Sequence, residues 1–525
     1  MALRSKNLFL WLCIYFCGLP SAESRRHVVA SVVRLSQLAQ FEQILVTFVR
    51  QRATQFPTHF VNFVSSIEED YARVYDYPAS FIDFPINQYR LIRRFSYNWP
   101  LWRTQLILQD SISKRTMKAS LSPEFMFLSF YKEQSVMHNK IDEFDHRFDS
   151  SMAAALITRL HILHRNKTRL LHEEPTGCPP LSEMELLELC TSVYDLQYFN
   201  YALHWMALFI DRMKKYLPYS SVMFMIDYVL KHSDTYGMPD HYNHILTVAE
   251  DTSIKALAEV TKLMKRHPLL LQRYYDYIDQ NLETQTCRSS PDRSEHGNYC
   301  FMFHSPRSPY APFKYEILHR DPYVAVVHNF MPIPVARKII SEATQRGSSA
   351  SKKFFRRGLP ALFAKLSEAT FLPPKHPVAS WIDHRVEHAT LLQPHSRPMP
   401  SDHRDGEMIK VVHYGLSGHY KGHRDFLSNA NYADILRKRG DRVATVLVYL
   451  SDVLSGGQTA FPLLNVSWAP RAGSALVWFN LDPWNGTRLT RTLHTACPVN
   501  VGKKWVINRW IKSHLRTGHL LPVVK

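Results

Sequence analysis

The sequence RVATVLVYLS at residues 442–451 decides the fold of the C-terminal part of this chain, together with GSALVWFNL at 473–481 and KWVINRWI at 504–511. All three segments are rich in β-branched and aromatic residues, and Gly, Pro and Asn separate them. This pattern is typical of β-strands joined by turns. It predicts an antiparallel jelly roll, a barrel of strands whose mouth can hold a small ligand.

A candidate metal-binding set surrounds these strands. His423 and Asp425 lie two residues apart, so on an extended strand they point to the same face, and His494 follows far downstream. Two imidazoles and one carboxylate fill one face of an octahedral Fe(II) and leave three positions open for O2 and a co-substrate. An isolated HxD triplet is a weak signal, because the chain has 27 His and a second triplet at residues 403–405. The alternative is a surface loop with a hydrogen-bonded Asp.

Lys504 follows His494 across a segment that is typical of a strand, a Gly-containing turn and a returning strand. Both side chains are therefore expected to face one cavity. A dicarboxylate co-substrate needs a cation at such a place, because its second carboxylate must be paired when it is buried. The alternative is an ordinary solvated lysine, a role for which the adjacent Lys503 is a candidate.

Several motifs of the C-terminal region resemble one family, the catalytic alpha subunits of collagen-type prolyl 4-hydroxylases. These motifs are HYG at 413–415, GHYKGHRDF at 418–426, YLSDV at 449–453, GGQTAFP at 456–462, HTACPV at 494–499 and GKKW at 502–505. Their order, spacing and flanking glycines agree over about a hundred residues, far beyond a short-motif match.

The resemblance implies roles for individual residues. His423, Asp425 and His494 would bind Fe(II), and Lys504 would pair the distal carboxylate of 2-oxoglutarate. Three further residues would line the co-substrate pocket: Tyr414, Thr459 and Trp510. The implied reaction is the hydroxylation of proline in proline-rich or collagen-like secretory polypeptides, with O2 as oxidant and ascorbate to restore oxidised iron.

One residue inside the metal motif departs from the family. Arg424 stands where family members usually have an aromatic residue. Because side chains alternate along a strand, Arg424 should point away from the iron.

The chain is long enough for several domains, because 525 residues exceed what one hydrophobic core organises. Apolar residues at a 3-4-3 spacing, Leu38, Phe41, Leu45 and Phe48, predict an amphipathic helix. With the resemblance, we expect an all-α N-terminal half followed by a double-stranded β-helix (jelly roll) catalytic domain. The expected units are a signal peptide at 1–22, a helical dimerisation region at 23–170, a TPR-like peptide-substrate-binding domain at 180–280, a disulfide-containing linker at 281–315 and the dioxygenase domain at 316–525.

The predicted peptide-binding region has the spacing of paired helices, which stack to form a concave groove. By the resemblance, Tyr194 and Tyr228 line this groove, where aromatic faces would pack on proline rings. The alternative is that both tyrosines belong to the core.

The first residues predict export. Basic residues precede the apolar run LFLWLCIYFCGL at 8–19, which is too short for an ordinary membrane span, and small residues follow it. A secretory signal peptide is therefore expected, with a signal anchor as the alternative. The mature chain is expected in the endoplasmic reticulum lumen, outside the membrane, where three sequons would accept glycans: Asn166, Asn465 and Asn485. The net charge of +18 is dispersed and comes with no nucleic-acid-binding motif, so we expect no nucleic acid partner.

The cysteine pattern also fits an oxidising compartment. Two of the seven cysteines lie in the predicted signal peptide. By the resemblance, Cys287 and Cys300 form a disulfide. Cys497 lacks the downstream cysteine that family members bond, so it is expected to stay free, and a pairing of Cys178 with Cys190 is left open.

The resemblance further implies a partner, protein disulfide isomerase as a beta subunit in a heterotetramer of two alpha and two beta chains. The C-terminus, LPVVK, carries no retention tetrapeptide of its own. Two other functions compete: a dioxygenase with a different peptide target, and a non-catalytic peptide-binding or assembly subunit. The intact His423, Asp425, His494 and Lys504 argue against the second.

Overall fold

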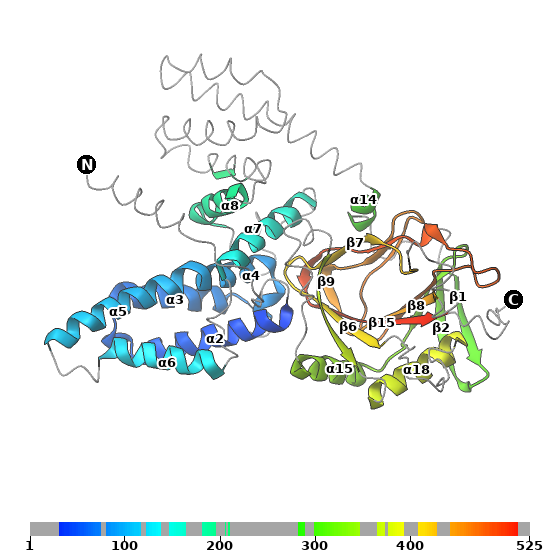
Figure 1. The fold of residues 1–525 in the computed structure, drawn as a ribbon, viewed down its shortest axis with the longest axis horizontal. Coiled ribbons are helices and arrows are strands. Elements are labelled where there is room, and N and C mark those ends of the chain that lie inside the picture. Colours follow the sequence, from blue (N-terminus) through cyan, green and yellow to red (C-terminus); the bar gives the residue numbers. More distant parts are fainter. Residues whose placement is uncertain are drawn as a thin grey trace, which may run out of the picture.

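The structure, a computed structural model, has a helical N-terminal half followed by a strand-rich C-terminal region (Figure 1). It describes residues 31–74, 80–116, 122–137, 146–163, 181–195, 205, 208–209, 282–288, 299–346, 365–372, 376–392, 408–427 and 441–512. The predicted signal peptide, Asn166, Cys178, Tyr228, the side chain of Tyr194 and most of the predicted peptide-binding domain lie outside these residues.

The helical half is built on one apolar cluster. Its helices are α2 (Val32–Arg50), α3 (Thr58–Ala72), α4 (Pro85–Arg93), α5 (Trp99–Thr116), α6 (Pro123–Met137), α7 (His146–Leu163) and α8 (Glu183–Asp195). The predicted stripe on α2 is confirmed, because Leu38, Phe41 and Leu45 are fully buried and Phe48 packs against the same cluster. Ser31 caps α2 by accepting a hydrogen bond from the backbone N–H of Arg34.

A buried carboxylate, Glu42 of α2, ties three other segments to that helix. Arg94 donates to both of its oxygens, through Nε at 2.8 Å and Nη2 at 2.7 Å. The Tyr71 hydroxyl and the Trp99 indole N–H donate at 2.8 and 2.9 Å. Burial alone would lower the pKa of the Arg94 guanidinium, but Glu42 outweighs it and raises that pKa. The charge of Glu42 is therefore compensated as long as all these partners are present.

Glu42→Ala should reduce the free energy of unfolding by about 3–5 kcal/mol, because it leaves the buried Arg94 without its main counter-charge. Urea unfolding followed by circular dichroism measures this loss. Glu68→Ala is the matched control, because Glu68 pairs with Arg50 on the surface at 2.9 Å, where such a pair contributes about 0–1 kcal/mol. Equal effects of the two substitutions would contradict the role of Glu42.

The strand-rich region contains two larger antiparallel sheets. One has the order β1 (Tyr299–Ser305), β2 (Ser308–His319), β3 (Val324–His328), β12 (Ala475–Phe479), β8 (Arg442–Tyr449), β15 (Lys504–Lys512), β6 (Ile409–Tyr414), β5 (Glu368–Leu372). The other has the order β11 (Val466–Trp468), β10 (Thr459–Phe461), β13 (His494–Ala496), β7 (His419–His423), β4 (Lys365–Leu366). A separate pair joins β14 (Val499–Gly502) to β9 (Val453–Gly456). The three strands predicted from the sequence are confirmed as β8, β12 and β15.

The two faces of the eight-stranded sheet have different cores. Helices α15 (Ile333–Arg346) and α18 (Pro377–Thr390) cover one face, where Ile339 and Ile382 pack with Val446 and Ile507 (Figure 1). A second apolar cluster contains alternate residues of the same strands, such as Leu447 and Val506, together with residues of the five-stranded sheet. Leu476, Trp478, Phe461 and Val466 belong to this second cluster as well.

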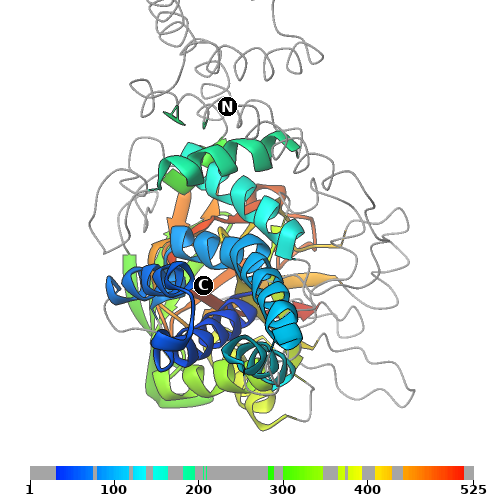
Figure 2. The same ribbon diagram turned by 90° about the vertical axis from the view of Figure 1, so that its left-hand side faces the viewer.

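The helical half contacts the strand-rich region directly, and seen from the helical side its helices stand in front of the strands (Figure 2). Arg34 of α2 pairs with Glu368 of β5 at 2.9 Å, and Lys503 pairs with Asp83 at 3.2 Å. Leu366 of β4 is buried in the apolar cluster of the helical half. The two halves of the chain therefore share an interface that the sequence did not reveal.

The cysteine pairing expected from the resemblance is wrong. Cys287 bonds to Cys497, with a Cα–Cα distance of 5.6 Å, whereas Cys300 is an exposed thiol. Cys300 lies on β1, at the edge of the eight-stranded sheet. Cys287 lies instead in α14 (Leu282–Arg288), which packs against β10 of the other sheet. Closeness in sequence therefore did not bring Cys287 and Cys300 together, and Cys497 is not free.

None of the helices in the described residues is both long enough and apolar enough to span a membrane.

Candidate metal centre and co-substrate pocket

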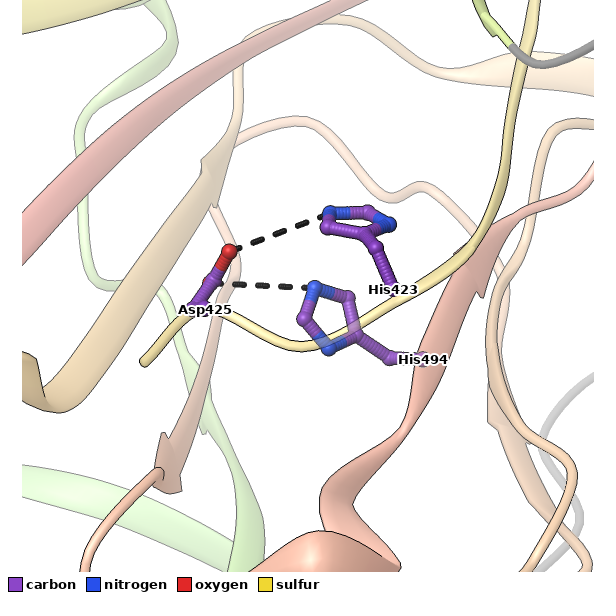
Figure 3. Close-up of side chains that lie close together, drawn as sticks. All are labelled: His423, Asp425 and His494. Carbon is purple, nitrogen blue, oxygen red and sulfur yellow. Dashed lines mark ion pairs between the residues drawn. The ribbon is translucent and has the colours of Figure 1, made fainter. Parts of the chain in front are cut away.

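Three predicted ligands come together at the end of two paired strands. His423 is the last residue of β7, His494 is the first residue of β13, and the two are direct partners across the strands. The chain then turns so that Asp425 approaches both imidazoles (Figure 3). Its Oδ1 lies 3.8 Å from Nε2 of His423, and its Oδ2 lies 3.7 Å from Nε2 of His494. The candidate ligand atoms all lie within 4.8 Å of one another, so one ion can contact all three residues.

The orientation of each imidazole is fixed by its other ring nitrogen. Nδ1 of His423 lies 2.9 Å from the carbonyl oxygen of Lys421, and Nδ1 of His494 lies 3.1 Å from that of Thr492. A carbonyl only accepts hydrogen bonds, so Nδ1 carries the proton in both rings and the lone pair of Nε2 faces Asp425. Burial and the neighbouring His494 lower the pKa of His423 to about 3, which keeps that imidazole neutral and able to bind a metal.

The carboxylate is supported by a chain of buried hydrogen bonds. The Thr445 hydroxyl donates to Oδ2 of Asp425 at 2.8 Å, and the Asn480 amide donates to that hydroxyl at 2.8 Å. The Trp478 indole N–H in turn donates to Oδ1 of Asn480 at 2.9 Å. Burial would raise the pKa of Asp425, but His494, His423 and the side chains of Trp510 and Thr445 outweigh it and lower that pKa. Thr445 and Asn480 were not predicted from the sequence, although the alternation along residues 442–451 places Thr445 on the same face as Leu447 and Tyr449.

Arg424, the residue that departs from the family, donates through Nε to the carbonyl oxygen of Thr490 at 2.8 Å. Its side chain is exposed. The guanidinium is thus hydrogen-bonded to the segment before β13, and Arg424 is not part of the three-residue ligand set.

A buried lysine lies on β15, the strand between β8 and β6. Lys504, the first residue of β15, is 1% exposed and pairs across the strands with Tyr414, whose ring centroid lies 5.0 Å from its Nζ. Among the described residues, its Nζ has no hydrogen-bond partner. Burial lowers the pKa of Lys504 to about 7. A buried ammonium without a partner is costly, so this position favours an anionic ligand such as a carboxylate.

The other predicted pocket residues differ in their positions. Thr459 of β10 is buried and accepts a hydrogen bond from the Tyr449 hydroxyl at 2.8 Å, which leaves the Thr459 proton available to a ligand. Trp510 lies six residues after Lys504 on β15, about 20 Å along an extended strand. Its ring is stacked on the Arg442 guanidinium at 3.8 Å. A direct contact of Trp510 with a co-substrate stays a prediction.

Two family models match the chain. The model described as the 2OG-Fe(II) oxygenase superfamily matches residues 409–512, which include the three candidate ligands and Lys504. The model of the prolyl 4-hydroxylase alpha-subunit N-terminal region matches residues 31–161, which span α2 to α7. Residues 409–512 are thus a 2OG-Fe(II) oxygenase domain, and they contain the donor set that binds iron in non-haem oxygenases.

Curated relatives extend the similarity beyond these two segments. Prolyl 4-hydroxylase subunit alpha-1 of Mus musculus is 25% identical over 467 residues, 83% of each chain. Subunit alpha-3 of Bos taurus is 34% identical over 236 residues, 44% of this chain, and that match spans only about two fifths (41%) of the relative. Over most of its length the chain is therefore similar to proteins named prolyl 4-hydroxylase alpha subunits. Among solved structures, a viral collagen prolyl hydroxylase of Paramecium Bursaria Chlorella virus-1, a 2OG complex, is 23% identical with a TM-score of 0.27, covering 36% of this chain and 96% of that one.

Proposed function

We propose that this chain is the catalytic alpha subunit of an Fe(II)- and 2-oxoglutarate-dependent prolyl 4-hydroxylase that acts on proline-rich or collagen-like secretory polypeptides. The observation that carries the proposal is that one oxygenase domain contains both the ligand set of His423, Asp425 and His494 and the buried ammonium of Lys504. We further propose that the two facing sheets form a double-stranded β-helix with the site between them, as the shared apolar cluster of both sheets supports.

Each residue of the site has a defined role in this reaction. The two imidazoles and Asp425 would hold Fe(II). When bound, the metal would supply the redox chemistry by which O2 oxidises 2-oxoglutarate to succinate and CO2 and adds its second oxygen atom to a proline C–H bond. Lys504 pairs with the distal carboxylate of 2-oxoglutarate, and the Tyr414 ring packs beside the Lys504 ammonium. Thr445 keeps the Asp425 carboxylate oriented. Ascorbate is proposed to return oxidised iron to the ferrous state.

The proposed setting is the endoplasmic reticulum lumen, with protein disulfide isomerase as the beta subunit of a heterotetramer. The Cys287–Cys497 disulfide supports an oxidising compartment. Asn465 and Asn485, two of the predicted glycan acceptors, are exposed. The groove of Tyr194 and Tyr228 remains our proposed site for the peptide. Co-purification of this chain from secretory cells with a disulfide isomerase in equal amounts would support the setting, and secretion of the chain alone would contradict it.

The chain, purified together with the proposed beta subunit and supplied with Fe(II), 2-oxoglutarate, O2 and ascorbate, should release succinate faster when a proline-rich peptide is added. Mass spectrometry of the peptide should show the gain of one oxygen atom on proline. The matched control is the same peptide with every proline replaced by alanine.

Two outcomes would contradict the proposal. Succinate release stimulated equally by the alanine peptide would indicate a dioxygenase with another target. No succinate with or without peptide, while iron binds normally, would indicate a non-catalytic assembly subunit.

A further inference from the structure

The short helix α14 precedes the oxygenase domain in sequence but lies against the strands that carry the iron ligands (Figure 1). It spans Leu282–Arg288, more than a hundred residues before β7. Glu283 and Cys287 are four residues apart in this helix, so they share one face. Glu283 contacts the five-stranded sheet through hydrogen bonds, and Cys287 forms a disulfide with Cys497, which directly follows β13.

Glu283 joins the two ligand-bearing strands through a single oxygen atom. Its Oε1 accepts a hydrogen bond from the backbone N–H of Gly422 at 3.3 Å and lies 2.7 Å from the hydroxyl of Thr495. Gly422 immediately precedes the ligand His423, and Thr495 immediately follows the ligand His494. The carboxylate therefore bridges β7 and β13 one residue from each imidazole ligand.

The sequence leaves room for this approach. A Cβ atom at position 422 would lie 3.2 Å from Oε2 of Glu283, so glycine lets the carboxylate come close to the β7 backbone. Thr495 is buried, and its hydroxyl also lies 2.9 Å from the carbonyl oxygen of Tyr420, a third contact between β13 and β7. Glu283 thus meets the two strands where they are already in contact.

The disulfide fixes the other end of the helix. Cys497 is 1% exposed and lies three residues after His494, so the Cys287–Cys497 bond ties α14 to the segment that leaves β13. Gln458 bonds to both cysteines: its side-chain amide donates to the carbonyl of Cys287, and its own carbonyl accepts from the N–H of Cys497 at 2.9 Å. We call α14 with Glu283 and this disulfide the α14 clamp.

We propose that Glu283 is a positioning residue for the iron centre and that the Cys287–Cys497 disulfide is its anchor, so that metal affinity depends on the oxidation state of this bond. The inference rests on the metal centre of the proposed function, but it adds residues outside the ligand set that determine the metal affinity. Reduction by a dithiol breaks the S–S bond, leaves two protein thiols, and converts the reductant to its cyclic disulfide. α14 then loses its covalent link to β13, and the bridge made by Glu283 weakens.

The first test measures the affinity of the full chain for Co(II), used as an oxygen-stable probe, by visible absorption and chelator competition. Glu283→Ala should weaken Co(II) binding by about 10–100-fold, the range typical of residues that orient metal ligands. Glu283→Gln should restore the affinity to within about threefold, because an amide oxygen can accept the same two bonds. Leu282→Ala, at an exposed position of the same helix, is the matched control and should leave affinity and spectrum unchanged.

The second test addresses the anchor. Cys287→Ser, or treatment with a dithiol that is removed before titration, should weaken Co(II) binding as Glu283→Ala does. The double variant Glu283→Ala/Cys287→Ser should be no weaker than either single variant, because both act through the α14 clamp. Cys300→Ser, which removes the exposed thiol, is the control for cysteine substitution.

Unchanged Co(II) affinity in Glu283→Ala, or additive losses in the double variant, would overturn the proposal. These readouts need no peptide and no turnover. If the chain failed to hydroxylate proline, the affinity measurements would still be interpretable. If the chain were a functional hydroxylase whose metal affinity did not change in the α14 clamp variants, only this inference would be refuted.

Discussion

His494→Ala should abolish succinate release and weaken iron binding by more than about 100-fold, beyond the 10–100-fold effect typical of residues outside the ligand set. His494 is buried, its Nδ1 is held by the Thr492 carbonyl, and its Nε2 faces Asp425 at 3.7 Å. No other described His, Cys, Asp or Glu joins the ligand set, so no described residue replaces the lost donor. His423→Ala should give the same result, because it removes the paired donor from β7.

Two controls make the loss specific. His384→Ala removes an exposed histidine of α18 and should leave turnover and iron binding unchanged. Thr445→Val keeps the side-chain shape but removes the hydrogen bond to Asp425, so it should fall between His384→Ala and His494→Ala in iron affinity. Iron content measured after gel filtration, together with succinate release, gives both readouts. Residual turnover in His423→Ala or His494→Ala would refute the ligand assignment.

The sequence predicted that His423, Asp425 and His494 come together, because part of this geometry is local. The two-residue spacing of His423 and Asp425 is a property of one strand end, and the strands that frame His494 have a clear pattern of β-branched and aromatic residues. The inward orientation of Thr445 could also have been predicted from the sequence. Thr445 lies on a predicted strand at an alternate position, but alternation alone does not say which inward residue meets Asp425.

Long-range pairings were not predictable in this way. The Cys287–Cys497 bond joins residues 210 positions apart, and it depends on where α14 lies after folding. Expecting Cys287 to pair with Cys300 relied on the resemblance, and no periodic pattern tests such a pairing. The same limit applies to Glu283, whose role depends on two strands that meet only in the folded domain.

The contacts between the two halves of the chain were not predictable from the sequence either. Lys503 was a candidate for an ordinary solvated lysine, but it is partly buried and pairs with Asp83 of the helical half at 3.2 Å. Burial raises the pKa of Asp83, and Lys503 only partly offsets this effect. The helical half therefore contacts the chain one residue from Lys504. Hydrophobic periodicity predicts each half separately, but it contains no information on how the halves dock.

Lys504→Ala should raise the concentration of 2-oxoglutarate needed for half-maximal turnover at least about 30-fold and leave iron binding largely intact. The reason is that removing one partner of a buried charge pair costs about 2–5 kcal/mol or more. Lys504 is buried without a hydrogen-bond partner among the described residues, so a ligand carboxylate is the counter-charge that its position lacks. Lys503→Ala is the matched control and should leave the requirement unchanged. An unchanged requirement in Lys504→Ala would refute the assignment.

The pH dependence of 2-oxoglutarate binding gives an independent check of Lys504. Burial lowers its pKa to about 7, so the ligand-free protein loses this charge as the pH rises through neutrality. A dicarboxylate binds the charged form, and binding above pH 7 must therefore take up a proton. The affinity should be constant below pH 7 with respect to this group and should fall by up to about tenfold per pH unit above it. Calorimetry in two buffers of different ionisation enthalpy measures the proton uptake, which should be present in the wild-type chain and absent in Lys504→Ala.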